Sequence, residues 1–292
     1  MDPSSLLQYL ITGVTVGATY GLTGLGFTII FNTTGIINFA QGEFVMLGGI
    51  LSVAASTAGL PLPLAILTAV TVTTLVGACL ERSCIRPVSS SSTINLIIIT
   101  IGASILIRGL VTLIWGKDTF ALPHFSSMEP IRFFGAAMLP QSLWVLGITL
   151  ILLVALKSFF ARTMWGRGML ACSFDPRAAA LMGIDVSRMA MASFMISAAV
   201  GAVGGVILAP LTMTSYDVGI LLGLKGFAAC ILGGLGNPFG AAAGGVILGI
   251  LESFGAGLLS SAYKDAITFV ILLLLLFVRP TGLFGRSASE RV

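Results

Sequence analysis

Apolar segments long enough to cross a membrane follow one another along almost the whole chain. A spanning helix needs about 20 predominantly apolar residues. Short polar stretches separate apolar segments at about residues 6–31, 44–58, 64–80, 93–115, 139–160, 189–211, 241–259 and 266–278. A shorter glycine-rich segment, 219–240, contains a lysine, and we expect it either to cross or to enter and return as a half-helix. No polar stretch is long enough to fold separately, so we predict one all-α polytopic membrane domain over residues 1–292.

The composition supports a membrane protein and excludes several kinds of chemistry. Hydrophobic residues make up 57% of the chain and charged residues 9%, whereas about a quarter of the residues in soluble domains are charged. The mean hydropathy is +1.07. The single His124 cannot form a metal site or a catalytic triad alone, and the cysteines are scattered at Cys79, Cys84, Cys172 and Cys230. The sequence contains no H-E-x-x-H, G-x-S-x-G or G-x-x-x-x-G-K-[ST] motif. We therefore expect no enzyme activity and no bound cofactor or metal.

The arginines predict the orientation of the chain in the membrane. The polar segment 162–188 carries four arginines and two aspartates, and short basic loops are retained on the cytoplasmic side. The tail 279–292 carries three more arginines, whereas the first residues are acidic and not basic. We therefore place the N-terminus outside and the C-terminus inside, which requires an odd number of crossings, and predict nine. If 219–240 re-enters, the number is eight and one terminus is misplaced. The net charge of +4 reflects this orientation and does not indicate a nucleic-acid partner.

Polar residues crowd the stretch that follows the first apolar segment. Asn38, Gln41 and Glu43 lie there, within FNTTGIINFAQGEF. A carboxylate inside a span costs about 2.5–3.5 kcal/mol on insertion scales, so such a residue usually faces a cavity or a partner. One interpretation is a loop at the inner face, with Glu43 favoured in the first turn of the next helix by the helix dipole. The other is that these residues line the translocation pathway, and the two can coexist.

A second group of polar candidates lies late in the chain and consists of Lys225, Asn237 and Glu252. Lys225 either meets an anionic group of a substrate or pairs with Asp217 at the outer surface, and the pairing is the favoured interpretation. Arg108, inside the fourth apolar segment, is expected to extend outward toward water rather than to bind a substrate.

The centre of the basic segment predicts a short helix over residues 176–182. Asp175 suits the N-cap, Pro176 the first helical position and Gly183 the end of the helix. A helix of this length with almost no apolar face is not expected to fill a core, so we expect it to be presented to a partner. Ala178 and Ala179 would allow close approach. They point about 100° apart, so a bulky residue should be much more harmful at one than at the other.

Four stretches in this order resemble one family of membrane proteins. They are NFAQGEF, RAAALMG, GLKGFAACILGGLGNPFGA and the closing RPTGLFG. Together they are similar to the inner-membrane permease of branched-chain amino acid ABC importers, of the LivH type. The resemblance implies a multi-pass protein of the bacterial inner membrane. It also implies a second related permease, two cytoplasmic ATPases that bind ATP and Mg²⁺, and a periplasmic substrate-binding protein as partners.

The central helix also resembles the E-A-A-x-x-x-G coupling motif of ABC importer permeases. Ala178, Ala179 and Gly183 fall on its Ala, Ala and Gly, and Asp175 and Pro176 precede them. Arg177 stands where an acidic residue is usual. This departure affects any salt bridge made from that position and not the helix itself.

The resemblance implies transport by alternating access, in which ATP closes the ATPases and the coupling helix passes their motion to the spans. Members of the family move branched-chain and other amino acids, urea, short amides or aromatic acids, and the sequence does not select among these substrates. The alternative classes are a secondary transporter or channel, and a membrane enzyme. A secondary transporter is expected to carry ionisable residues deep in several spans, and few are present here.

Overall fold

The computed structural model is almost entirely helical and describes residues 3–89, 91–133, 135–258, 260–279 and 281–285. Its helices are α1 (Pro3–Thr34), α2 (Gln41–Thr57), α3 (Leu62–Leu80), α4 (Thr93–Trp115), α5 (Pro140–Arg162), α6 (Met164–Phe174), α7 (Pro176–Leu181), α8 (Val186–Thr212), α9 (Val218–Gly233), α10 (Pro238–Leu258) and α11 (Lys264–Val278). Short turns of other helix types occupy Glu81–Ile85, Arg86–Val88 and Ser261–Tyr263. Strands β1 (Ile131–Phe133) and β2 (Ala136–Met138) form one antiparallel hairpin.

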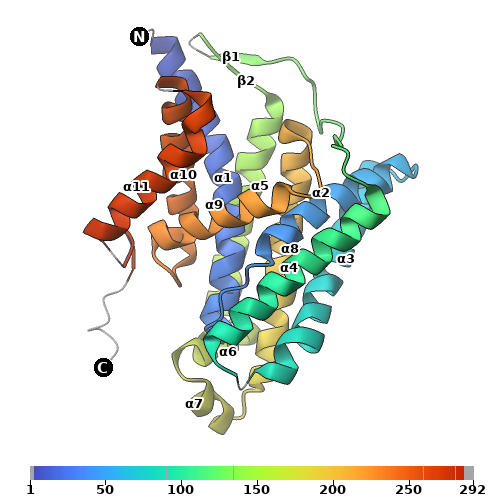
Figure 1. Ribbon diagram of the computed structural model, residues 1–292, viewed down its shortest axis with the longest axis vertical. Coiled ribbons are helices and arrows are strands. Elements are labelled where there is room, and N and C mark those ends of the chain that lie inside the picture. Colours follow the sequence, from blue (N-terminus) through green and yellow to red (C-terminus); the bar gives the residue numbers. More distant parts are fainter. Residues whose placement is uncertain (1–2, 90, 134, 259, 280, 286–292) are drawn as a thin grey trace.

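The two ends of the helical bundle carry different elements (Figure 1). The start of α1 and the hairpin lie at the top of the view, where the Ala137 amide donates to Gln8 Oε1 at 2.8 Å. Helices α6 and α7 lie at the bottom. The arginine-rich segment and the start of the chain are therefore at opposite ends, as the predicted orientation requires. We call the end with the hairpin the outer end. The predicted placement of the tail is only partly described, because residues 286–292 lie outside the described part of the chain.

Seven helical segments in the described residues are long and apolar enough to cross a membrane, and they contain α1, α3, α4, α5, α8, α10 and α11. Helices α2 and α9 are shorter, with 17 and 16 residues. At 1.5 Å per residue each is about 25 Å long, somewhat less than the roughly 30 Å hydrocarbon core. The all-α polytopic fold is confirmed. The count of nine crossings depends on α2 and α9 and remains a prediction.

Glycines bring backbones into direct contact along the buried helix α1. Gly17 faces Gly245 of α10, and a Cβ placed on Gly17 would lie 2.6 Å from the Gly245 carbonyl oxygen. The same geometry brings Gly42 of α2 against Gly219 of α9. Small residues at helix interfaces permit such close approach in membranes, where packing replaces the hydrophobic effect as the main attraction between helices. Because any side chain at these positions would push the helices apart, the glycines fix the spacing of α1 with α10 and of α2 with α9.

Lys225 joins four helices through one buried polar network. Its Nζ, on α9, donates to Glu252 Oε1 on α10 at 2.8 Å and to the Tyr20 hydroxyl on α1 at 3.1 Å. It also forms an ion pair with Asp265 Oδ1 on α11 at 2.6 Å, without the geometry of a hydrogen bond. Tyr20 in turn donates to Glu252 Oε2 at 2.9 Å. The favoured pairing of Lys225 with Asp217 is therefore wrong. Asp217 precedes Lys225 by eight residues, about two helical turns, and accepts instead from the Ser215 hydroxyl at 2.6 Å.

Two elements, α6 and the hairpin, were not predicted from the sequence. The basic segment 162–188 contains a second helix, α6, whose N-cap Thr163 accepts a hydrogen bond from the Gly166 amide at 3.0 Å. Scattered arginine and glycine residues obscured its apolar side, which packs against α5 and α8. The hairpin is two three-residue strands, too short for an alternating pattern to reveal.

We expect the Lys225 network to be essential for the stability of the isolated subunit. Lys225→Met removes the only cation of the described network and leaves Glu252 buried without a counter-charge. Breaking one partner of a buried ion pair costs about 3–5 kcal/mol. Denaturant unfolding in detergent should show a loss of that size. Lys117→Met, at an exposed loop position, serves as the matched control, and equal stability of the two variants would contradict the role assigned to Lys225.

Candidate translocation and coupling sites

The break between α1 and α2 places polar groups deep inside the bundle. Gln41, the first residue of α2, is fully buried and is held by Ser197 of α8. The Ser197 hydroxyl lies 2.6 Å from Gln41 Oε1, and Gln41 Nε2 donates to the Ser197 carbonyl at 3.3 Å. The same hydroxyl also lies 2.8 Å from the Gly26 carbonyl of α1. Three helices are thus joined at the point where α2 begins.

Glu43 occupies the first turn of α2, as one interpretation of the sequence predicted. Its side chain is 1% exposed. Oε1 accepts from the Ser104 hydroxyl of α4 at 2.8 Å, whereas Oε2 has no hydrogen-bond partner among the described residues. Arg108, one turn further along α4, is near enough to act electrostatically on the carboxylate. Glu43 therefore has one satisfied oxygen and one buried oxygen without a hydrogen-bond partner among the described residues.

A polar stripe on α4 covers this junction and was missed in the sequence analysis. Thr100, Ser104 and Arg108 recur every four residues, which places them on one face of the helix. Thr100 accepts from the Phe39 amide at 3.2 Å, so it satisfies part of the irregular backbone between α1 and α2. The spacing of four inside an apolar segment is the signal that could have identified this stripe. Arg108 is half-buried next to Glu43 and not fully extended into water.

Asn38 has a local role within the same break. Its Oδ1 accepts from the Ala40 amide at 3.1 Å, which closes a turn immediately before α2. Its Nδ2 is buried and has no partner among the described residues. The structure thus brings Asn38, Gln41 and Glu43 to one junction but gives each a different environment. Whether they line the pathway stays a prediction.

The second group of candidates does not form one site. Lys225 and Glu252 are in direct contact, but Asn237 lies in the turn before α10. Asn237 Oδ1 accepts from the Phe239 and Gly240 amides, each at 3.1 Å, and so caps the start of α10. In this conformation the Lys225 ammonium group contacts three groups of its own chain. Whether Lys225, Asn237 and Glu252 also line the pathway stays a prediction.

The short helix in the basic segment forms as predicted, as α7. Asp175 is its N-cap and accepts from the Arg177 and Ala178 amides at 2.8 and 3.1 Å. Gly183 follows the helix with φ +84°. The Gly183 amide donates to the Ala180 carbonyl at 3.0 Å and the Ile184 amide to the Ala179 carbonyl at 3.1 Å, the Schellman pattern of a glycine-terminated helix. Both caps follow from the residues that the sequence indicated.

The two adjacent alanines of α7 have opposite environments. Ala179 is 5% exposed and packs with Met169, Cys172 and Met189 between α6 and α8, whereas Ala178 is exposed. A bulky residue at 179 would therefore disturb the loop itself, contrary to the expectation that this alanine faces a partner. Ala178 is the alanine of the pair whose side chain is accessible. Arg177, where the motif usually has an acid, is exposed as well.

Large apolar side chains are exposed around α7, at the end opposite the hairpin. Leu181 is 89% exposed and Met182 83%, and Phe174 and Trp165 on α6 are also exposed. Large exposed apolar side chains that gather on a surface are typical of a contact with another protein or with the membrane. Its position beside the arginines puts it in the segment assigned to the cytoplasm (Figure 1).

Comparison with known proteins places the chain among transport permeases. The family model described as "Branched-chain amino acid transport system / permease component" matches residues 9–276. The LivH permease protein of the Salmonella typhimurium high-affinity branched-chain amino acid transport system is 35% identical, covering 98% of this chain and 97% of that protein. The corresponding BraD protein of Pseudomonas aeruginosa is 34% identical, covering 98% of each chain.

A solved structure has a related fold at low sequence identity. PsaBC from Streptococcus pneumoniae, in complex with Fab, superposes with a TM-score of 0.52 and 14% identity, covering 95% of this chain and 92% of that one. At this identity the likeness concerns the fold alone. The family match and the full-length relatives carry the assignment. The chain belongs to the branched-chain amino acid transport system permease family.

Proposed function

We propose that this chain is the membrane-embedded permease subunit of a bacterial ABC importer for branched-chain amino acids. The observation that carries the proposal is the family match over residues 9–276, together with relatives of the same length named as branched-chain amino acid permeases. The chain translocates a solute and catalyses no reaction itself. Other solutes of the wider group, such as other amino acids, urea, short amides and aromatic acids, are the alternatives that a transport assay separates.

The proposed partners are two cytoplasmic ATPases that bind ATP and Mg²⁺, a second related permease and a periplasmic binding protein. Support for an ATPase contact comes from the exposed surface around α7, which combines Arg177, Ala178, Leu181 and Met182. A capped two-turn helix with this composition presents a rigid, partly apolar surface to a protein partner. Arg177 favours an acidic residue on that partner, because the usual acidic position of the motif is reversed in charge here.

The packing of α7 suggests how motion at the ATPases would reach the membrane. Ala179 packs against Met189 at the start of α8, and Ser197 lies two turns further along α8. Ser197 holds Gln41 at the start of α2. Helix α8 therefore connects the coupling loop to the α1–α2 junction as one rigid element. The distance along the helix from Val186 to Ser197 is about 16 Å at 1.5 Å per residue. When α7 is displaced, α8 carries Gln41 and the start of α2 with it.

Glu43 is the proposed pathway residue of the junction. Its free oxygen, its burial and the nearby Arg108 distinguish it from the fully paired Lys225 and Glu252. When α2 moves relative to α4, the contact with Ser104 opens and the carboxylate becomes available to the ammonium group of an amino acid. A secondary transporter would also use a buried carboxylate, so a direct test of energy coupling separates the two classes.

The permease alone should not transport. Purified chain in liposomes should show no leucine uptake with or without ATP, whereas the complete importer with binding protein and ATP should accumulate leucine. The sequence contains no phosphate-binding loop, so energy must come from the partners. Leucine flux through the chain alone, driven by a proton or sodium gradient, would establish a secondary transporter and refute the proposal.

A bulky residue at Ala178 should uncouple the complex and leave the permease folded. The Ala178 side chain is exposed, so Ala178→Trp should abolish co-purification of the ATPases and reduce substrate-stimulated ATP hydrolysis at least about 10-fold. Ala179→Trp should instead lower the stability of the permease, because overpacking a filled site costs about 1–3 kcal/mol. Ala137→Trp, exposed at the outer end, is the matched control for ATPase retention. Normal ATPase binding and activity in Ala178→Trp would show that α7 is not the contact.

Removal of the Glu43 charge should slow transport without preventing assembly. Glu43→Gln keeps the size and an oxygen that can accept from Ser104 but removes the negative charge that would pair with an ammonium group. A hydrogen bond to a charged group contributes about 1.5–3 kcal/mol, so uptake by the assembled importer should fall at least about 10-fold. Ser104→Ala, which leaves the charge in place, should have a smaller effect. Unchanged uptake by Glu43→Gln would mean that the carboxylate only starts the helix.

A further inference from the structure

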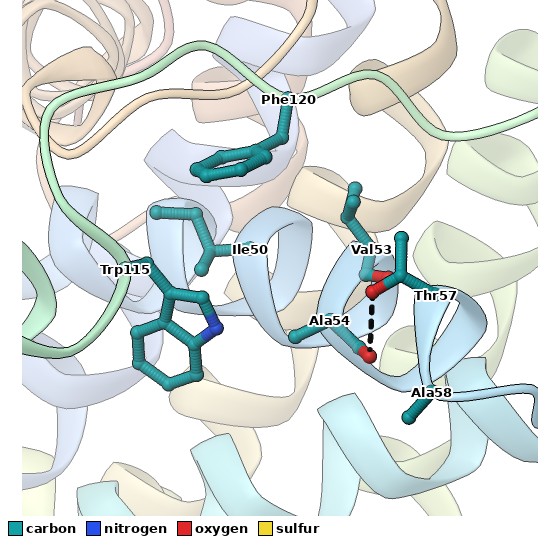
Figure 2. Close-up of a pocket in the computed structure, with 7 residues that line it drawn as sticks. All are labelled: Ile50, Val53, Ala54, Thr57, Ala58, Trp115 and Phe120. Carbon is teal, nitrogen blue, oxygen red and sulfur yellow. Dashed lines mark hydrogen bonds between the residues drawn. The ribbon is translucent and has the colours of Figure 1, made fainter.

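An open pocket lies between α2 and α4 at their outer ends (Figure 2). Its volume is about 340 Å³, within the range of about 300–1,000 Å³ that is typical of small-molecule sites. The lining comes from the outer half of α2, the last residue of α4 and the loop that follows α4. It consists of Ile50, Val53, Ala54, Thr57, Ala58, Trp115 and Phe120. None of these seven side chains is charged, so the pocket suits an apolar group.

The one hydroxyl of the lining is turned toward its own helix. Thr57 Oγ1 donates to the carbonyls of Val53 and Ala54, in each case at 3.0 Å. Figure 2 shows the side chain of Ile50 between the rings of Trp115 and Phe120 on one side of the pocket. The surface offered to a ligand is therefore made of two aromatic rings and short aliphatic groups. A branched aliphatic side chain matches this surface in polarity and in size.

The pocket is at the outer end of the bundle, which the predicted orientation places toward the substrate supply. Phe120 and Thr214 form a two-way backbone pair, with N–O distances of 2.8 and 2.7 Å. Thr214 belongs to the connection between α8 and α9, at the end of α8 opposite α7. The loop over the pocket is thus fixed to the outer end of the bundle. A solute that arrives from outside reaches this pocket before the buried junction at the start of α2.

Opposite charges lie deeper along the same two helices. Glu43 precedes Ile50 by seven residues on α2, and Arg108 precedes Trp115 by seven residues on α4. Seven residues correspond to about 10 Å, or two turns. Leu47 and Val111 fill the space between these levels in the present conformation. From the outer end inward, the interface between α2 and α4 therefore contains an apolar pocket and then, about two turns deeper, a carboxylate and a guanidinium group. This order suits a solute with an aliphatic side chain and two opposite charges.

We propose that this pocket receives the aliphatic side chain of the transported amino acid, and that Ile50, Ala54 and Trp115 determine which side chain fits. The inference rests on the proposed function and adds a selective step inside the permease, after capture by the binding protein. Discrimination by one methylene in an apolar pocket ranges from about 10- to 200-fold. At an open pocket such as this one, the lower end of that range is expected.

The test compares leucine and valine uptake by the complete importer. Each amino acid is added at a concentration that saturates the binding protein. Differences in the affinity of the binding protein for leucine and valine then do not affect the uptake ratio. Ala54→Leu fills the pocket and should lower leucine uptake about 10-fold relative to valine uptake. Ile50→Ala enlarges it and should shift the ratio in the opposite direction. Ala55→Leu, on the same helix but outside the lining, should leave the ratio unchanged.

The outcomes separate this inference from the proposed function. If the wild-type importer takes up both amino acids and Ala54→Leu and Ile50→Ala leave the leucine-to-valine ratio at the wild-type value, the pocket is not selective and only this inference fails. If leucine uptake and valine uptake fall by the same factor, the ratio is also unchanged and this inference fails in the same way. If the importer with Ala54→Leu does not assemble, the leucine-to-valine uptake ratio of Ile50→Ala alone tests the inference. Absence of leucine and valine uptake by the wild-type importer, with uptake of another solute, refutes the proposed function and this inference together.

Discussion

The need to satisfy polar groups away from water governs the arrangement of this protein. The chain breaks between α1 and α2 inside the bundle, where an unpaired backbone or side-chain group costs several kcal/mol. Ser197 of α8 pairs with Gln41, and Thr100 and Ser104 of α4 pair with the Phe39 amide and Glu43. Helices α4 and α8 therefore have to cover the break. The contacts of α4 and α8 with the start of α2 meet this requirement.

The rest of the bundle is held by two different means. Backbone contact through glycine joins α1 to α10 and α2 to α9, whereas buried charge joins α9, α10 and α11 to α1 around Lys225. The Lys225 network has few unsatisfied groups and fixes these helices relative to one another. The Glu43 carboxylate has an unpartnered oxygen and contacts α4 through one hydrogen bond. We infer that movement during transport is concentrated between α2, α4 and α8 and not around Lys225.

Most of the fold could be predicted from the sequence because lipid requires long apolar helices, and their pattern is strong. Residues 93–115 were predicted as a helix with the bounds that the structure has. The caps of α7 were also predictable, since Asp175 and Gly183 act on neighbouring residues. Side-chain partners that are distant in sequence were not predictable. The partner of Lys225 was mistaken because Asp217 is near in sequence, while Glu252 and Asp265 become neighbours only when α10 and α11 pack. The inward direction of Ala179 depends in the same way on α6, which was not recognised.

We infer that α8 carries motion from the coupling helix to α2 through the contact between Ser197 and Gln41. Spin labels at Ala58 on the outer end of α2 and at Ala262 beyond α10, in a background without reactive native cysteines, report that motion in the complete importer. We predict that ATP changes the distance between the labels in the otherwise wild-type complex. We also predict that Gln41→Ala removes most of the change while the ATPases still bind and hydrolyse ATP. An equal change of distance in the Gln41→Ala complex would contradict the claim.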